Sequence, residues 1–212
     1  LRGWKHYLYD EMGRTYLDAY NNVPHVGHAH PRINAVTARQ SRLINTNTRY
    51  LHPAQVKFAD ALRQRLPAHL THCYFVTSGS EANELALRLA RAYTGYRGMI
   101  VQDHAYHGHT TGTIDISPYK FNGPGGAGAP DWVEITEIAD PYRGAYGYDD
   151  PDAGEKYAAD IDRAIAALNA RGQSLAGFIA ESYPSVGGQI EPPAGYLAGV
   201  YERIRAAGGL CI

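Results

Sequence analysis

Residues 73–91 constrain the fold of this sequence more than any other stretch. Four β-prone apolar residues, Cys73–Val76, predict a buried strand that ends at a turn. The small residues Thr77–Ser80 form that turn, and a helix is expected after it. The predicted apolar stripe of the helix has i, i+3, i+4 and i+7 spacing and comprises Ala82, Leu85, Ala86, Leu89, Ala90 and Tyr93.

The start of this helix is suited to binding an anion. A strand–turn–helix junction directs several backbone N–H groups, and the positive end of the helix dipole, at one point. Gly79 allows close approach of a ligand, and Ser78 or Ser80 can donate a hydrogen bond or cap the helix. An ordinary cap with nothing bound is the alternative. The turn matches neither a Walker A loop nor a GxGxxG fingerprint, so a nucleotide is not the expected ligand.

Composition limits the class of protein. The 212 residues are 44% hydrophobic and 19% charged with a net charge of −1, which suits one good-sized core and argues against a nucleic-acid surface. The sequence has no apolar run of about 18 residues and no signal-peptide layout, so a soluble, cytoplasmic protein without a membrane segment is expected. Cys73 and Cys211 stand alone in apolar stretches and predict buried free thiols.

The remaining pattern alternates helices and strands. A hairpin is expected around Gly13, and amphipathic helices are expected from Pro31 to about Ile44 and from about Val56 to Pro67. Further on, strands are predicted at residues 99–101, 133–135, 175–180 and 208–212, with helices at about 161–168 and 196–204, and residues 123–130 are expected to form a glycine-rich loop. This order predicts an α/β fold with a mostly parallel sheet and helices on both faces. The last strand is cut short, so the chain is expected to be a piece of a longer one.

Ligands of parallel α/β sheets gather at the carboxyl ends of the strands. Three loops are predicted there, at residues 78–80, 104–108 and 181–188. In the second, Tyr106 is either a core residue or an aromatic face that stacks on a planar ligand. In the third, Glu181 follows four apolar residues, and burial without a polar partner would be costly for it.

Two other sets of residues permit more than one interpretation. His104, His107 and His109, like His28 and His30, imitate the spacing of metal ligands, but no fixed fourth ligand is evident and no metal is expected. The basic residues Arg49, Lys120 and Arg143 stand in loops, where each is either a solvated charge or an anion contact.

Three motifs in order make the sequence similar to a known family. Residues 78–83 (SGSEAN), residues 106–108 (YHG) and Glu181 with Gly187 and Gly188 resemble the class III, ornithine-type aminotransferases, which are pyridoxal phosphate enzymes of fold type I. The likeness is collinear over nearly the whole chain. It implies that pyridoxal 5'-phosphate is held by Ser78, Gly79, Ser80, Tyr106, His107 and Glu181. It also implies a division into residues 1–45, part of a small domain, and residues 46–212, the incomplete first part of the cofactor-binding domain.

Within the family, the sequence is most similar to the branch of ethanolamine-phosphate phospho-lyases and alanine–glyoxylate aminotransferase-like proteins. Residues 45–52, 103–109, 115–121 and 181–189 carry this likeness. Val186 departs from the ornithine type, which has an acid there that gates a substrate-binding arginine, and this departure favours a lyase. The aspartate for the pyridine nitrogen and the Schiff-base lysine are expected beyond Ile212, so residues 1–212 alone should be inactive.

The resemblance implies a small amine substrate and leaves three functions open. The first is elimination of phosphate from an amino phosphate such as phosphoethanolamine, the second is transamination to a 2-oxo acid, and the third is a non-catalytic module with the same fold. Candidate substrate contacts are Asn22, Arg49, Lys120 and Arg143. A homodimer, and fusion to a phosphotransferase domain in a longer chain, are further expectations from the family.

Overall fold

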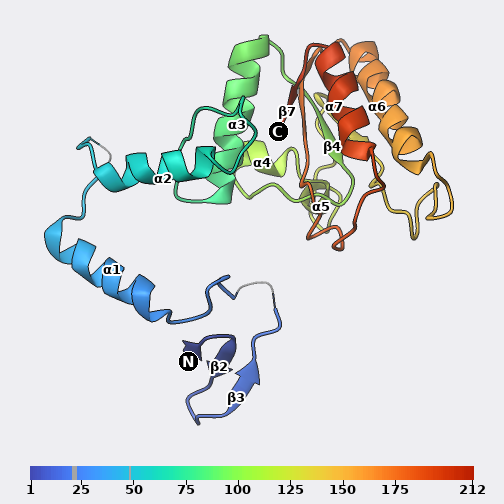
Figure 1. Ribbon diagram of the computed structural model, residues 1–212. Helices are drawn as coiled ribbons and strands as arrows, with labels where there is room; N and C mark the ends of the chain where they lie inside the picture. The colour runs from blue at the N-terminus through green and yellow to red at the C-terminus, as the bar shows by residue number, and fades with distance from the viewer. Residues whose placement is uncertain (21–22, 48) are drawn as a thin grey trace. The chain divides into compact units, whose positions relative to one another are not determined.

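A computed structural model describes residues 1–20, 23–47 and 49–212, and its contacts divide the chain into Leu1–Cys73 and Tyr74–Ile212 (Figure 1). We call these the first unit and the second unit. Asn22, a candidate substrate contact, lies outside the described residues. The division between residues 45 and 46 concerns the domains of the longer family fold and stays a prediction.

The first unit contains a small antiparallel sheet and two helices. The sheet has the order β1-β2-β3, and the elements are β1 (Arg2–Trp4), β2 (Tyr7–Tyr9), β3 (Thr15–Leu17), α1 (Pro31–Leu43) and α2 (Pro53–Arg63). The predicted hairpin is confirmed: Asp10 Oδ1 accepts from the backbone N–H groups of Met12 and Arg14, and Gly13 adopts φ +80°. Each helix begins at a proline, which suits the first helical position because its missing N–H has no partner there in any case.

The second unit contains a four-stranded sheet of order β5-β4-β6-β7, whose adjacent strands are all parallel. Its strands are β4 (Gly98–Gln102), β5 (Val133–Thr136), β6 (Leu175–Ile179) and β7 (Leu210–Cys211). Its helices are α3 (Gly79–Thr94), α4 (Thr111–Ile114), α5 (Pro118–Phe121), α6 (Ala153–Ala170) and α7 (Tyr196–Ala206). The short helices α4 and α5 were not predicted.

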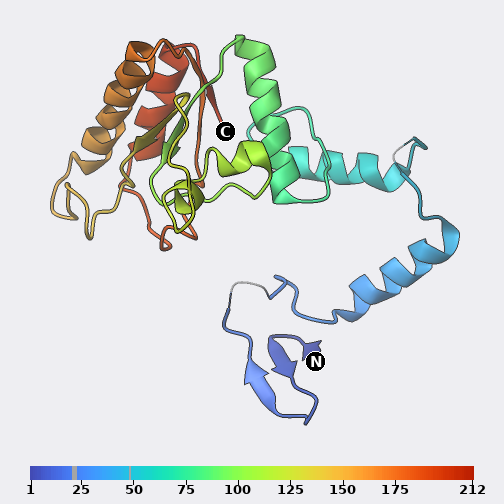
Figure 2. The same cartoon turned by 180° about the vertical axis from the view of Figure 1, so that it is seen from behind.

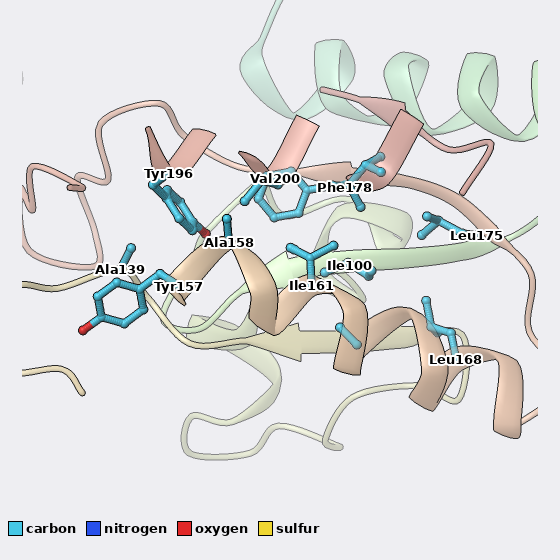
Figure 3. Close-up of a cluster of buried hydrophobic side chains, with 12 residues drawn as sticks. Ile100, Ala139, Tyr157, Ala158, Ile161, Leu168, Leu175, Phe178, Tyr196 and Val200 are labelled. Carbon is cyan, nitrogen blue, oxygen red and sulfur yellow. The ribbon is translucent and has the colours of Figure 1, made fainter. Parts of the chain in front are cut away.

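Helices cover both faces of this sheet, as predicted (Figures 1 and 2). Side chains of α6 and α7 pack on one face around Ile100 and Phe178 (Figure 3). On the other face Leu87 of α3 packs with Met99 and Val101. Every residue of β4 and β6 is therefore buried, which is typical of parallel strands covered on both sides.

Three predictions of local structure are wrong. Residues 73–76 form no strand, and Tyr74 and Val76 are 66% and 42% exposed, because β-prone residues form a strand only where a neighbouring strand pairs with them. The helix expected to reach Pro67 ends at Arg63. In α3 the buried residues are Ser80, Leu87 and Ala90, whereas Tyr93 of the predicted stripe is 79% exposed, because packing partners and not periodicity decide which side is covered. Both cysteines are free, as predicted, but each is only half-buried.

Candidate functional site

The first turn of α3 leaves two backbone amides for a ligand. The Ser78 hydroxyl accepts from Glu81 N at 3.1 Å, and the Ser78 carbonyl accepts from Ala82 N at 3.0 Å. The preceding amides, those of Gly79 and Ser80, have no acceptor among the described residues. A Cβ placed on Gly79 would meet no atom within 4 Å, so the space beside this residue is open. Free amides at the positive end of a sixteen-residue helix suit a phosphate group.

Glu81 fixes the approach of the chain to this turn. Its Oε2 accepts from Thr77 Oγ1 at 2.6 Å and from Thr77 N at 2.8 Å. These bonds lower the pKa of Glu81 below its ordinary value, so the side chain is a carboxylate at neutral pH. The segment before the helix is thus fastened by hydrogen bonds although it belongs to no strand.

The loop after β4 packs directly against α3. Ser80 Oγ accepts from His109 N and lies within hydrogen-bond distance, 3.2 Å, of His109 Nδ1. Gly108 adopts φ +139°, and a Cβ there would lie 2.7 Å from both Ser80 Oγ and Thr113 Oγ1. Only glycine allows this approach. The first two predicted loops are therefore neighbours.

A second bond from α3 reaches the same loop. Asn83 Nδ2 donates to the carbonyl of His107 at 2.8 Å. On the other side, His107 N donates to Ser117 Oγ at 2.9 Å, and that hydroxyl donates to Thr113 O at 2.6 Å. The backbone of His107 is thus held at both its N–H and its carbonyl.

Tyr106 is half-buried at this place and is not a core residue. Its ring meets the ring of Tyr119 edge-on, with centroids 6.1 Å apart and planes at 79°. Lys120 Nζ lies 5.7 Å from the Tyr106 centroid and 5.2 Å from that of Tyr119. The ring thus has fixed neighbours on one side and remains partly accessible.

His107 is buried, with only 5% of its surface exposed. Its Nε2 has no hydrogen-bond partner among the described residues. Burial lowers the pKa of His107 to about 4, so the ring is neutral at pH 7. A neutral, buried imidazole with one unpaired nitrogen is prepared for a further polar partner.

The third predicted loop meets the second one through Gly187. A Cβ on Gly187 would lie 3.7 Å from the Cβ of His104 and 3.1 Å from Ile138 Cδ1. A cavity of about 640 Å³ lies between these loops and includes Asp103, His104 and Arg143 in its wall. Glu181 is half-buried and its Oε2 accepts from Ser185 N at 3.0 Å, which supplies the polar partner expected for it.

The candidate substrate contacts fall in different places. Lys120 lines a cavity of about 520 Å³ that shares Asp103 and His104 with the one lined by Arg143. Neither cation forms an ion pair with a residue that the structure describes. Arg49 lies in the first unit, exposed, with its backbone N–H bonded to Asn47 Oδ1 at 3.1 Å. The role of each stays a prediction.

Sequence reasoning missed Asn83 and His109 as parts of the site. Asn83 lies one helical turn after Ser80, so their common face was a signal that could have identified it. His109 was considered as a metal ligand and as part of the likeness at residues 103–109, but not as a contact of α3. Within the described ranges, no group of three or more His, Cys, Asp or Glu side chains converges in a way that could hold a metal ion.

The fold and this site together define an α/β protein in which two open amides at the start of α3 lie beside a loop that carries an aromatic residue. The family model for class III aminotransferases matches residues 2–212, and the chain belongs to this family, whose members are pyridoxal phosphate-dependent enzymes of fold type I. The resemblance found in the sequence is thereby confirmed.

Two relatives and one solved structure show which members of the family this chain is similar to. An alanine–glyoxylate aminotransferase 2-like protein of Drosophila melanogaster is 49% identical over 100% of this chain and 44% of its own length. An ethanolamine-phosphate phospho-lyase homologue of Caenorhabditis elegans is 38% identical over 97% of this chain and 46% of its own length. A phospholyase from Arthrobacter, solved with phosphoethanolamine, has 41% identity and a TM-score of 0.87, covering 100% of this chain and 49% of that one. The chain thus spans about half the length of these relatives.

Proposed function

We propose that this chain binds pyridoxal 5'-phosphate at the start of α3. The supporting observation is the pair of open amides at Gly79 and Ser80, with the loop that carries Tyr106 fastened to the same turn. In this proposal the amides bind the phosphate, the Tyr106 ring stacks on the pyridine ring, and His107 and Glu181 lie close to the cofactor. Ser78 contributes by capping the helix. When bound, the cofactor supplies an electron sink for a carbanion at the amine-bearing carbon.

Cofactor binding is tested by adding pyridoxal 5'-phosphate to a polypeptide of the relatives' full length that includes residues 1–212. We expect the induced circular dichroism of a bound, asymmetrically held cofactor. A Gly79→Val variant should weaken binding, because its side chain occupies the space beside the amides. The variant Gly147→Val is a control for a glycine substitution away from the site, because Gly147 has no positive φ and a Cβ there would meet only Pro141 O, at 3.7 Å. Unchanged binding by Gly79→Val would contradict the proposal.

We further propose that the full-length enzyme eliminates phosphate from an amino phosphate such as phosphoethanolamine. Two relatives named as phospho-lyases and the apolar Val186 support this reaction. Loss of phosphate from the neighbouring carbon, followed by addition of water, yields an aldehyde, ammonia and inorganic phosphate. Lys120 and Arg143 are cations without ion-pair partners in the described part of the chain, and they are the candidates that hold the leaving phosphate.

The reaction is tested by measuring phosphate and ammonia released from phosphoethanolamine in a one-to-one ratio. Lys120→Met or Arg143→Gln should raise KM by about tenfold, the effect of losing one charged contact of about 1.4 kcal/mol. Lys156→Met is the matched control, because Lys156 pairs with Asp150 at 2.6 Å and lines neither cavity of the site. Equal KM in all variants would exclude both cations as phosphate contacts.

A transaminase is the second candidate, and the 49% identity to an alanine–glyoxylate aminotransferase 2-like protein favours it. Transfer of an amino group to pyruvate without phosphate release would establish it. A non-catalytic module would give neither reaction. A homodimer stays a prediction, and the mass of the full-length protein in solution tests it. The cytoplasmic location and the fusion to a phosphotransferase domain also stay predictions. No helix among the described residues could cross a membrane.

A further inference from the structure

We propose that Asn83 is a positioning residue, whose side-chain amide sets the distance of the Tyr106 ring from the anion-binding turn of α3. This inference rests on the proposed function, because it takes Tyr106 to stack on the cofactor whose phosphate the turn binds. Its basis is the 2.8 Å hydrogen bond from Asn83 Nδ2 to the carbonyl of His107.

The bond joins α3 to the loop that carries Tyr106. Asn83 follows Ser80 by one helical turn, so both side chains leave α3 on the same face. The carbonyl it binds belongs to the residue directly after Tyr106. A change in this bond therefore moves the peptide between His107 and Gly108, which is one peptide unit closer to Tyr106 than the His109 N–H that Ser80 binds.

The loop has no freedom to compensate for a lost bond by sliding. Ser117 Oγ accepts from His107 N at 2.9 Å, and Tyr119 N donates to Ala105 O at 3.1 Å, so the far side of the loop is fixed to α5 and the turn before it. These contacts hold the loop laterally. The contacts toward α3 include the hydrogen bonds of Ser80 and Asn83 and the close approach of the Gly108 backbone.

A second link between the same segments provides a structural comparison. Thr110 Oγ1 donates to Glu84 Oε2 at 2.5 Å, so the residue after Asn83 also binds the chain that follows the loop. Thr110 lies four residues beyond Tyr106. If Asn83 only stabilised the packing of the loop, Thr110→Val, which removes the hydroxyl donor and keeps the side-chain shape, should affect the cofactor as much as Asn83→Ala does.

The experiment uses a polypeptide of the relatives' full length that includes residues 1–212, with Asn83→Ala, Asn83→Asp, Tyr106→Ala and the double variant of Asn83→Ala with Tyr106→Ala. Asn83→Asp keeps the side-chain shape but loses the donor, and it serves if the alanine variant does not fold. Asn169→Ala, an exposed asparagine in α6, is the matched control. The readouts are the dissociation constant of pyridoxal 5'-phosphate, its induced circular dichroism, and competition by inorganic phosphate.

Both Asn83 variants are expected to weaken cofactor binding by about tenfold and to reduce the circular dichroism, with phosphate competition unchanged within about twofold. The double variant should be no weaker than Tyr106→Ala alone, because both substitutions remove one interaction. Thr110→Val should keep the circular dichroism. Additive losses, an equal loss of phosphate binding, or a normal signal in both Asn83 variants would overturn the role of Asn83. No signal in the wild-type protein would overturn the proposed function instead.

Discussion

Both units of this chain contain well-formed helices, but the units differ in how far those helices are buried. No residue of α1 or α2 in the first unit is buried, and Ile33 of α1 is 54% exposed. In the second unit α6 alone buries seven residues, and Ile161 is fully buried. Local signals such as a proline at the first position thus suffice to place a helix, whereas the free energy of packing comes from the sheet.

The largest expected difference between the units is the effect of one isoleucine in each. Ile161→Ala should lower the free energy of unfolding of the 212-residue chain by about 2–5 kcal/mol, because it leaves a cavity between α6 and the sheet. Ile33→Ala should change it by less than about 0.5 kcal/mol. Chemical denaturation measures both. Equal losses would show that α1 is covered by other parts of the chain.

The second expected difference between the units is how their histidines affect stability at acidic pH. The pKa of His107 is about 4 in the folded chain and about 6.5 when unfolded, so between these values only the unfolded state binds the proton. The contribution of the neutral His107 ring to the free energy of unfolding is complete above pH 6.5. It decreases by about 3 kcal/mol as the pH falls to 4. In His107→Gln this part of the slope should vanish. His25→Gln, an exposed residue of the first unit, should keep it, and thermal melting from pH 4 to 8 measures both.

The third difference concerns glycines. Gly108→Ala combines a positive φ with a Cβ only 2.7 Å from two oxygens, and should cost about 2–4 kcal/mol. Gly13→Ala in the hairpin also has a positive φ, but its Cβ would meet no atom within 4 Å, so only backbone strain of about 1 kcal/mol is expected. Denaturation curves test the ranking. A larger loss at Gly13 would mean that the close packing of the loop on α3 contributes little.

The smallest effects belong to the helix caps. Ser78→Ala removes the acceptor for Glu81 N and should cost about 1 kcal/mol. His52→Ala removes the acceptor for Ala54 N at 3.2 Å in α2 and should cost a few tenths of a kcal/mol, since α2 has no buried face to lose with it. The melting temperatures of the two variants give the comparison. A greater loss in His52→Ala would show that α2 depends on its cap alone.

The sequence predicted features whose causes are local. The hairpin around Gly13 and the cap at Ser78 depend on residues within four positions of each other. The strands 98–102 and 175–179 were found because burial on both faces leaves a continuous apolar run. Residues 73–76 are also apolar and β-prone, but nothing local shows whether a neighbouring strand exists.

The contacts of the site were harder to predict because they span long stretches of sequence. Asn83 binds a carbonyl 24 residues away, and Ser80 binds a backbone amide 29 residues away. The motifs showed that the loops at 78–80 and 104–108 belong together, and the structure places them together. The sequence did not show which atoms join these loops, because that depends on three-dimensional packing. For the same reason it did not show that the position after His107 has to be a glycine.

The central strand β4 alternates between two environments, and this alternation limits how the protein can change. Met99 and Val101 belong to the layer beneath α3, whereas Ile100 packs against α6 and α7, and Gln102 Nε2 donates to the Tyr196 hydroxyl at 3.0 Å. Insertion of one residue in β4 would turn each side chain to the opposite layer and place the Gln102 amide among apolar groups. Changes in length should therefore be tolerated in the connecting loops, whereas this five-residue segment has to keep its frame.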